Sequence, residues 1–225
     1  MIDLSQESEQ KSAYGPVPSG SRVLVRLTIE KPKYASHDDE LVAMAKTGLL
    51  QLFCRLEVAA GSYEGVAWYE NITLPSRAQN IRLTEGQQKA CGSGGRTLRA
   101  IVEAVRCVDP KDKSPEADRK RVLNSWSDLD GMEFPARLGI SREPYEGRDG
   151  RMYWSNTLGR ILPCTDKEYQ EIMNGGEVIT DGPVVGDQQP RQQAPRQTGG
   201  YADTGYPSGG YADRAPDYGT DGVPF

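Results

Sequence analysis

Alternating hydrophobic residues define two consecutive strands between Leu49 and Leu74. Every second residue from Leu50 to Val58 is apolar, and after a glycine-containing connection the alternation resumes from Val66 to Leu74, with Glu70 as its only charged member. Successive side chains of a strand point to opposite faces, so each run has one apolar face, and the short connection predicts a β-hairpin. The other face carries two aromatic rings and a cation, from Phe53, Tyr69 and Arg55. We expect this second face to meet solvent, which makes it a candidate binding surface.

Periodicity elsewhere predicts three further strands and one principal helix. Alternation favours strands at Arg22 to Ile29, Met132 to Ile140 and Arg151 to Leu162. Apolar residues at i, i+3, i+4 and i+7 indicate an amphipathic helix from Leu98 to Val105, with Thr97 as its cap. Minor predictions are a short helix from Ser36 to Gly48, helical turns at Thr84 to Ala90 and Asp166 to Met173, a loop at Cys91 to Gly95 and an exposed insertion at Asp109 to Arg121.

Composition divides the chain into three parts. Residues 1–20 are polar and end in a cluster of glycine and proline, which predicts a flexible lead-in. Residues 21–181 contain all of the predicted strands, and we expect them to form one domain. From residue 182 the composition collapses to Gln, Gly, Pro, Tyr and Asp, and the pentapeptide GGYAD occurs twice. Because this tail lacks aliphatic clusters that would offset its ordering entropy, we expect residues 182–225 to be disordered.

Enzymes and membrane proteins find little support in these residues. No apolar run approaches the roughly 20 residues that span a membrane, we expect no secretory leader, and four cysteines without close pairing favour reduced thiols in the cytoplasm. We therefore expect no catalysis, no cofactor, no metal and no membrane partner. The less favoured alternatives are a metal at His37, a zinc ion at Cys91 and Cys107, and a backbone phosphate contact at Gly92 to Thr97, which lacks the P-loop lysine.

The predicted order of elements is three strands, a helix and two strands, which is the order of the five-stranded OB barrel. With this order, and with the run Leu129 to Phe134 and the strand Tyr153 to Leu158 in its second half, the chain resembles the single-stranded DNA-binding proteins of bacteria and, more closely, of bacteriophages. Its tail is also similar to theirs, because acidic residues precede a terminal Val-Pro-Phe. The resemblance implies a mainly β fold, an OB-fold barrel at residues 21–181 with an inserted helix, and a disordered tail with an acidic tip.

The function that the resemblance implies is sequence-independent coating of unwound DNA in phage DNA replication, recombination and repair, in the host cytoplasm if the protein is phage-encoded. In that family the tip docks onto replication or recombination proteins. The corresponding partner-binding residues here are Asp217, Asp221, Val223, Pro224 and Phe225. Association into a homo-oligomer stays open. Two alternatives also stay open, a single-strand annealing recombination protein and a non-enzymatic barrel that binds only protein.

Proteins hold single strands by stacking bases on aromatic rings and by following the phosphates with cations. Phe53 and Tyr69 are the main stacking candidates, although the same rings could instead pack against a helix or a second copy. Trp68 and Trp154 share the phase of aliphatic residues, so we expect both in the core. The predicted DNA-binding residues are Arg26, Lys31, Lys33, Tyr34, Phe53, Arg55, Tyr69, Arg137, Arg148, Arg151 and Tyr153, with Tyr63 and Tyr145 nearby.

Overall fold

The structure is a computed structural model that describes residues 15–32, 39–79, 81–147 and 150–180. The chain divides into two units, Met1–Gln189 and Pro190–Phe225, and every described residue belongs to the first. Some predictions therefore lie outside the described residues, namely those for most of the lead-in and for the whole tail. The individual candidates that lie outside them are Lys33, Tyr34, His37, Arg148, Asp217, Asp221, Val223, Pro224 and Phe225.

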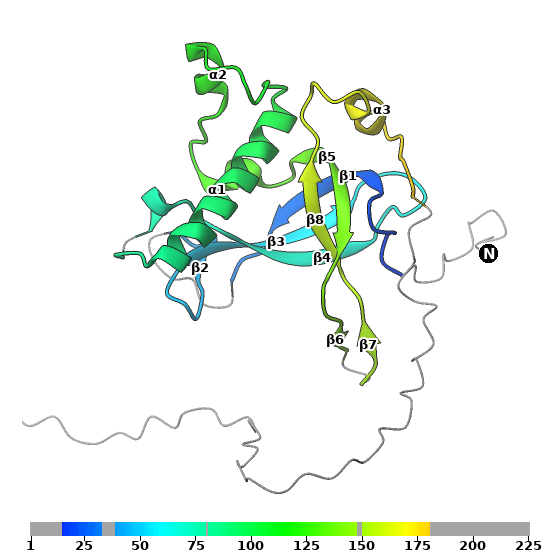
Figure 1. The fold of residues 1–225 in the computed structure, drawn as a ribbon, viewed down its shortest axis with the longest axis horizontal. Helices are drawn as coiled ribbons and strands as arrows, with labels where there is room; N and C mark the ends of the chain where they lie inside the picture. Colours follow the sequence, from blue (N-terminus) through cyan, green and yellow to red (C-terminus); the bar gives the residue numbers. More distant parts are fainter. Residues whose placement is uncertain (1–14, 33–38, 80, 148–149, 181–225) are drawn as a thin grey trace, which may run out of the picture. The chain divides into compact units, whose positions relative to one another are not determined.

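Strands make up most of the regular structure in the described residues (Figure 1). The strands are β1 (Arg22–Ile29), β2 (Val42–Met44), β3 (Leu50–Val58), β4 (Ala67–Thr73), β5 (Glu133–Ile140), β6 (Tyr145–Glu146), β7 (Met152–Tyr153) and β8 (Asn156–Ile161). The α-helices are α1 (Glu85–Val105), α2 (Pro115–Lys120) and α3 (Tyr169–Met173), and two 3-10 turns are η1 (Ser76–Ala78) and η2 (Trp126–Leu129). The prediction of a mainly β fold is confirmed.

Six strands form one antiparallel sheet with β3 near its centre. The order of pairing is β2-β3-β1-β5-β8. Strand β4 is not part of this series and pairs with β3. The register brings apolar residues opposite one another, such as Val25 opposite Val58 and Leu56 opposite Trp68. The strand predicted at Arg22 to Ile29 and the hairpin of β3 and β4 are thus confirmed.

The two end strands of this sheet, β4 and β8, lie next to each other. The backbone N–H of Leu158 in β8 donates a hydrogen bond to Oε1 of Glu70 in β4. The indole Nε1–H of Trp68 donates to the same oxygen at 3.1 Å. No backbone ladder joins these two strands in the described part of the chain. A side chain, rather than a backbone ladder, therefore connects β4 and β8.

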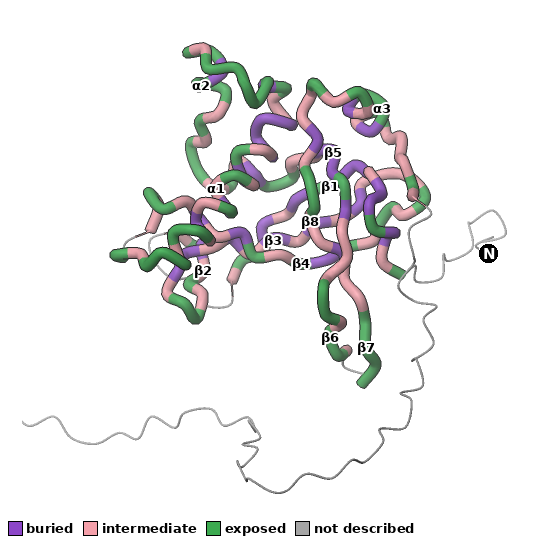
Figure 2. Tube along the Cα trace, viewed as in Figure 1, coloured by how far each residue is buried: buried purple, intermediate pink, exposed green. Residues whose placement is uncertain are grey.

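The core lies on the inner face of the sheet, under α1. Val25, Leu56 and Phe134, from three neighbouring strands, are completely buried, and α1 adds Leu98 and Ile101 to the same cluster. Figure 2 shows the buried segments concentrated in these strands and in α1. Alternation along β3 is complete, with every second residue buried, because one face of the strand meets the core and the other does not.

One of the two tryptophans expected in the core is there and the other is not. Trp68 is buried, so that prediction is confirmed. Trp154 is only half-buried and lies outside the core cluster, so its assignment to the core was wrong. The reason is that the strand predicted from Arg151 to Leu162 is interrupted at this residue. It is split into β7, which pairs with β6 in a separate hairpin, and β8, which belongs to the main sheet.

Helix α1 begins much earlier than the sequence predicts. Thr84 caps it, since the Thr84 hydroxyl accepts from the backbone N–H of Gln87 while the Gln87 side chain accepts from that of Thr84. The predicted loop at Cys91 to Gly95 lies inside this helix, and Thr97 is not its cap. Packing explains the glycines: a Cβ at Gly94 would lie 1.8 Å from the carbonyl oxygen of Thr73 in β4. Glycine lets the helix and the strand approach this closely.

The helix predicted from Ser36 to Gly48 is also wrong in its described part. Asp39 accepts a hydrogen bond from the backbone N–H of Leu41 at 2.9 Å, which closes a turn, and the chain then enters β2. Strand β2 pairs with β3 through Val42 opposite Leu52. Asp39 thus closes a turn, and the segment that follows it forms a strand because pairing with β3 gives its backbone a partner.

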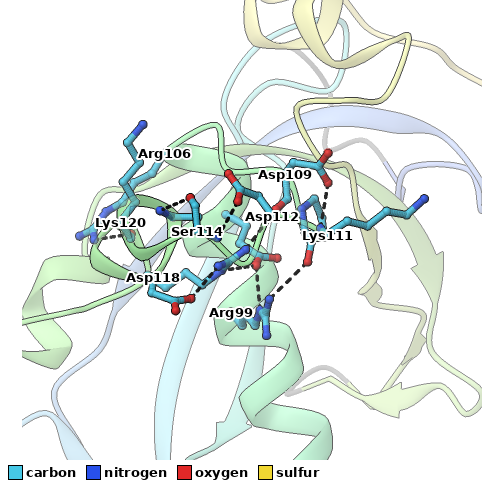
Figure 3. A network of polar contacts seen from close by, with 12 residues as sticks. Arg99, Arg106, Asp109, Lys111, Asp112, Ser114, Asp118 and Lys120 are labelled. Atoms are coloured by element: carbon cyan, nitrogen blue, oxygen red, sulfur yellow. Dashed lines mark hydrogen bonds and ion pairs between the residues drawn. The ribbon is translucent and has the colours of Figure 1, made fainter.

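The segment from Asp109 to Arg121, predicted as an exposed insertion, is mostly exposed and is fastened to α1 by polar contacts (Figure 3). The carboxylate of Glu103, only 5% exposed, accepts from Nε of Arg99 and from Nε of Arg121, both at 2.7 Å. The turn predicted at Asp166 to Met173 is confirmed as α3. No helix in the described ranges has both the length and the apolar character needed to cross a bilayer.

Candidate nucleic-acid interface

The outward face of the β3–β4 hairpin presents a stacked pair of aromatic rings. The centroids of Phe53 and Tyr69 lie 5.5 Å apart and their planes differ by 9°. Tyr69 is 58% exposed, and Phe53 is half-buried. Both rings are outside the core, as the alternation of the two strands predicts. A flat, partly exposed aromatic surface of this kind can stack with a planar ligand group.

The register of the hairpin sets this geometry. Arg55 lies directly opposite Tyr69, and Phe53 lies opposite Asn71, so the two rings occupy diagonal positions on one face. The guanidinium of Arg55 forms an ion pair with the carboxylate of Glu57, two residues along the same strand. The structure therefore brings together three of the predicted DNA-binding residues, Phe53, Arg55 and Tyr69.

Arg26 on β1 extends this face, but its charge is already compensated. It lies between Glu57 on β3 and Glu133 on β5 in the register of the sheet. Its guanidinium donates to Oε1 of Glu133 from Nη2 at 2.6 Å and from Nε at 2.8 Å. This hydrogen-bonded carboxylate raises the pKa of Arg26. Lys31 is paired in the same way with Glu40, at 3.0 Å. A phosphate that binds at these cations would compete with a carboxylate or share the cation with it.

Arg137 belongs to a different part of the outer face. It stands in register between Arg22 of β1 and Arg160 of β8. Arg22 pairs with Glu168 at 2.8 Å and Arg160 with Asp166 at 3.6 Å, whereas Arg137 is exposed and has no carboxylate partner among the described residues. The outward Leu24, which packs with Leu162 and Ile172 beside α3, separates this arginine row from the ring pair. The structure does not bring Arg137 to the Phe53–Tyr69 surface.

A second pair of rings lies on the β6–β7 hairpin, which projects away from the main sheet (Figure 1). Tyr145 and Tyr153 are opposite each other, with centroids 5.9 Å apart and a tilt of 32°. They are 56% and 40% exposed, and Met152, which precedes Tyr153 in β7, is 58% exposed. Arg151 is also exposed on this arm. Figure 2 shows the arm exposed along most of its length. Tyr153 and Arg151 therefore lie together on one hairpin that is separate from the main sheet.

Sequence reasoning named Tyr145 only as a neighbour of the site and missed Met152, Arg22 and Arg160. The pairing of Tyr145 with Tyr153 could have been found, because each tyrosine lies near one end of a glycine-rich turn that a hairpin would close. The arginine row could not have been found in the same way. It depends on the register of three strands that are far apart in the sequence.

Glu70 fixes the position of β4 relative to β8. Burial raises the pKa of the Glu70 carboxyl, and the hydrogen bonds from Leu158 and Trp68 partly oppose this rise. Opposite Glu70 on β3, Cys54 is completely buried. Burial, with the nearby Glu70 charge, raises the pKa of the Cys54 thiol to about 12, so Cys54 is not a ready nucleophile.

The described residues contain no cluster of three or more His, Cys, Asp or Glu side chains that could hold a metal ion. Cys91 is buried in α1 and Cys107 is exposed after its end. Burial and a neighbouring Cys107 raise the pKa of the Cys164 thiol to about 11. The arrangement offers stacking surfaces and cations. No model of a known protein family matches this chain, and comparison with curated proteins finds no similar sequence.

Proposed function

We propose that this protein binds single-stranded DNA without sequence preference, through the outward face of β3 and β4 and the β6–β7 arm. The observation that carries the proposal is the stacked pair Phe53 and Tyr69 on the outward face of the sheet, with Tyr69 58% exposed and Phe53 half-buried. Every base has an aromatic face, so stacking on such rings is tolerant of sequence and contributes about 1–3 kcal/mol per base. The second ring pair, Tyr145 and Tyr153, offers a further stacking position on the arm.

The strand arrangement supports an OB-fold barrel. In chain order, β1, β3 and β4 correspond to its first three strands, α1 to its helix, and β5 and β8 to its last two. The pairing order β4-β3-β1-β5-β8, with β4 and β8 adjacent through Glu70, is the arrangement that such a barrel requires. Strand β2 is then an addition to the edge of β3. OB folds bind oligonucleotides on an outer strand face, which here includes Phe53.

The charge distribution implies that stacking contributes more to binding than phosphate contacts do. The chain has a net charge of −5, and Arg26, Lys31 and Arg55 each pair with a carboxylate. A phosphate that displaces a carboxylate exchanges one ion pair for another. We therefore expect affinity to weaken with salt less steeply than for a protein that neutralises each phosphate with an unpaired cation.

In this proposal the protein is non-enzymatic, needs no cofactor and coats unwound DNA in the cytoplasm during phage replication, recombination or repair. The tail tip, with Asp217, Asp221, Val223, Pro224 and Phe225, recruits replication or recombination proteins. These parts rest on the resemblance of the sequence to phage single-stranded DNA-binding proteins. They are tested by retention of such proteins on the full chain but not on a chain that ends before Asp217.

A fluorescence titration with oligo-dT tests the binding itself. We expect quenching of the intrinsic fluorescence, and we expect Phe53→Ala and Tyr69→Ala each to weaken binding about tenfold, the loss of one good stack. Met44→Ala is the matched control, because Met44 is 54% exposed but lies on β2. Wild-type affinity in both ring variants, with unchanged circular dichroism, would remove the ring pair from the binding site.

A barrel that binds only protein is the second candidate, and the ion pairs of Arg26, Lys31 and Arg55 favour it, since they leave this face with few unpaired charges. The absence of any fluorescence change with oligo-dT at low salt would select this candidate. A strand-annealing protein would also bind oligo-dT, but it would in addition accelerate the pairing of complementary oligonucleotides.

A further inference from the structure

A groove of about 550 Å³ lies along α1, between the turn η1 on one side and the segment from Arg121 to Trp126 on the other. Four arginines line it, Arg77, Arg96, Arg99 and Arg121, and its described lining contains no carboxylate. The Phe53–Tyr69 surface contributes none of this lining. The groove is therefore a separate, arginine-rich feature that the proposed DNA site does not use.

Two of these arginines are held in place from behind. Glu103 accepts hydrogen bonds from Arg99 and from Arg121, and Arg121 also pairs with Asp118 at 3.0 Å. Arg99 further donates to the carbonyl oxygen of Pro110 at 3.3 Å, which joins α1 to the following segment (Figure 3). The side chain of Arg121 is only 12% exposed. These contacts fix the wall of the groove before any ligand arrives.

The other two arginines are available to a ligand. Arg77, in η1, and Arg96, in α1, are exposed, and the guanidinium group of neither makes an ion pair or hydrogen bond within the described residues. They stand on the groove lining near Ser76. Two unpaired guanidinium groups at the rim of one groove attract an anionic ligand, and each can bind a carboxylate through two parallel hydrogen bonds.

The floor of the groove is aliphatic. It is lined by Pro75, Leu98, Val102 and Leu123, with one aromatic residue, the half-buried Trp126. Two glycines of α1 line the groove, so no side chain of theirs fills it. The space beside Gly92 is open except for the Arg96 guanidinium, which lies 3.5 Å from where a Cβ would be. Aliphatic side chains pack well against such a floor, whereas bases stack on exposed aromatic faces.

We infer that this groove binds an acidic peptide segment of a partner protein, with carboxylates on Arg77 and Arg96 and aliphatic or aromatic side chains on the floor. Charge complementarity and the aliphatic lining together favour this partner over a second track for nucleic acid. The assignment goes beyond the proposed DNA binding and does not depend on it. It gives the body of the protein a partner-binding surface of its own.

A fluorescein-labelled peptide of alternating aspartate and leucine, measured by fluorescence anisotropy on the full chain, tests the inference. We expect saturable binding that weakens with salt, and much weaker binding when serine replaces leucine or lysine replaces aspartate in the peptide. Removing both rim charges, by Arg77→Ala with Arg96→Ala, should weaken binding about tenfold or more. The double variant Lys46→Ala with Lys167→Ala removes the same charge from exposed positions elsewhere and should have no such effect.

Gly92→Leu is the sharper variant. It fills the groove without changing charge, and in a helix leucine is favoured over glycine by about 0.5–1 kcal/mol, so the fold should be at least as stable. We expect peptide binding to be lost while the thermal transition is retained or raised. Peptide binding that is absent in the wild type, equal in Gly92→Leu, or equal for the serine peptide would overturn the inference.

The same variants distinguish the peptide from nucleic acid. If oligo-dT displaces the labelled peptide, and its affinity falls in Gly92→Leu as much as the affinity for the peptide does, the groove is a nucleic-acid track and the peptide assignment is wrong. Unchanged oligo-dT binding in Gly92→Leu supports a separate peptide site. Failure of the proposed DNA function would appear instead as no response to oligo-dT with the peptide result intact.

Discussion

Replacement of Glu70 tests whether one side chain closes the sheet. Both donors that reach this carboxylate, the backbone N–H of Leu158 and Nε1–H of Trp68, bond to the same atom, Oε1. The amide oxygen of a glutamine can accept both hydrogen bonds in the same place. Glu70→Gln therefore removes the buried charge and keeps the connection between β4 and β8, whereas Glu70→Ala removes both.

The magnitudes follow from these contacts. In Glu70→Ala two donors lose their acceptor next to a core in which Trp68 is 3% exposed. An unsatisfied buried donor costs about 1–3 kcal/mol, so we expect a loss of about 2–4 kcal/mol in the free energy of unfolding. That is a large part of the 5–15 kcal/mol typical of a domain. The free energy of unfolding of Glu70→Gln should stay within about 1 kcal/mol of the wild-type value. Its hydrogen bonds are weaker because the acceptor is neutral, but burying a neutral amide costs less than burying a carboxylate.

The two variants also differ in their dependence on pH. Burial raises the pKa of Glu70 in the folded state above its unfolded value, so the native state binds the proton more tightly. The resulting stabilisation is complete below the unfolded pKa and is lost as the pH rises through the folded pKa. Between these two pKa values the free energy of unfolding of the wild type should therefore fall relative to that of Glu70→Gln. At higher pH the difference between the two proteins should stay constant.

Urea unfolding followed by tryptophan fluorescence, repeated from acidic to neutral pH, measures both effects. If Glu70→Gln lowers the free energy of unfolding as much as Glu70→Ala does, the ionised carboxylate is essential. A difference between wild type and Glu70→Gln that does not change with pH would show that Glu70 is not desolvated in the native state. Either result would refute the reasoning.

Two further predictions concern packing and thiol chemistry. Gly94→Ala should lower the free energy of unfolding by about 1–3 kcal/mol, because its Cβ would lie 1.8 Å from the carbonyl oxygen of Thr73. Urea unfolding measures this loss. The control is Gly86→Ala, which has open space in the same helix and should be neutral or stabilising. A thiol reagent followed by absorbance at mildly alkaline pH should modify the exposed Cys107 quickly and Cys54 only after unfolding. Rapid modification of Cys54 in the native protein would contradict its burial.

The strands could be predicted from the sequence because their information is local. In β1, β3 and β5, alternation of apolar and polar residues follows directly from one buried and one outward face. The placement of Phe53 and Tyr69 on a common outward face was predictable for the same reason, since the alternation fixes the face of each strand on which the ring lies.

The rest depended on contacts between distant segments. The glycines of α1 favour a loop by propensity, and only the approach of Gly94 to Thr73 explains why they belong to a helix. Strand β2 is three residues long, too short for a period to be recognised. The partners of Arg26 were also hidden, because Glu133 reaches it only when β1 pairs with β5. Free cations were therefore predicted where the fold supplies ion pairs.

The paired state of Arg26 has a consequence for selectivity. A guanidinium whose charge is already paired with Glu133 gains less from meeting an arbitrary polyanion than an unpaired one would, because the carboxylate repels the incoming anion. Heparin, duplex DNA and other anionic polymers would thus compete poorly for this face. A ligand would be selected mainly by whether it has flat, unstacked groups that can stack on the neighbouring rings. Such a surface binds weakly to a ligand that offers only negative charge and more tightly to one that also offers planar groups.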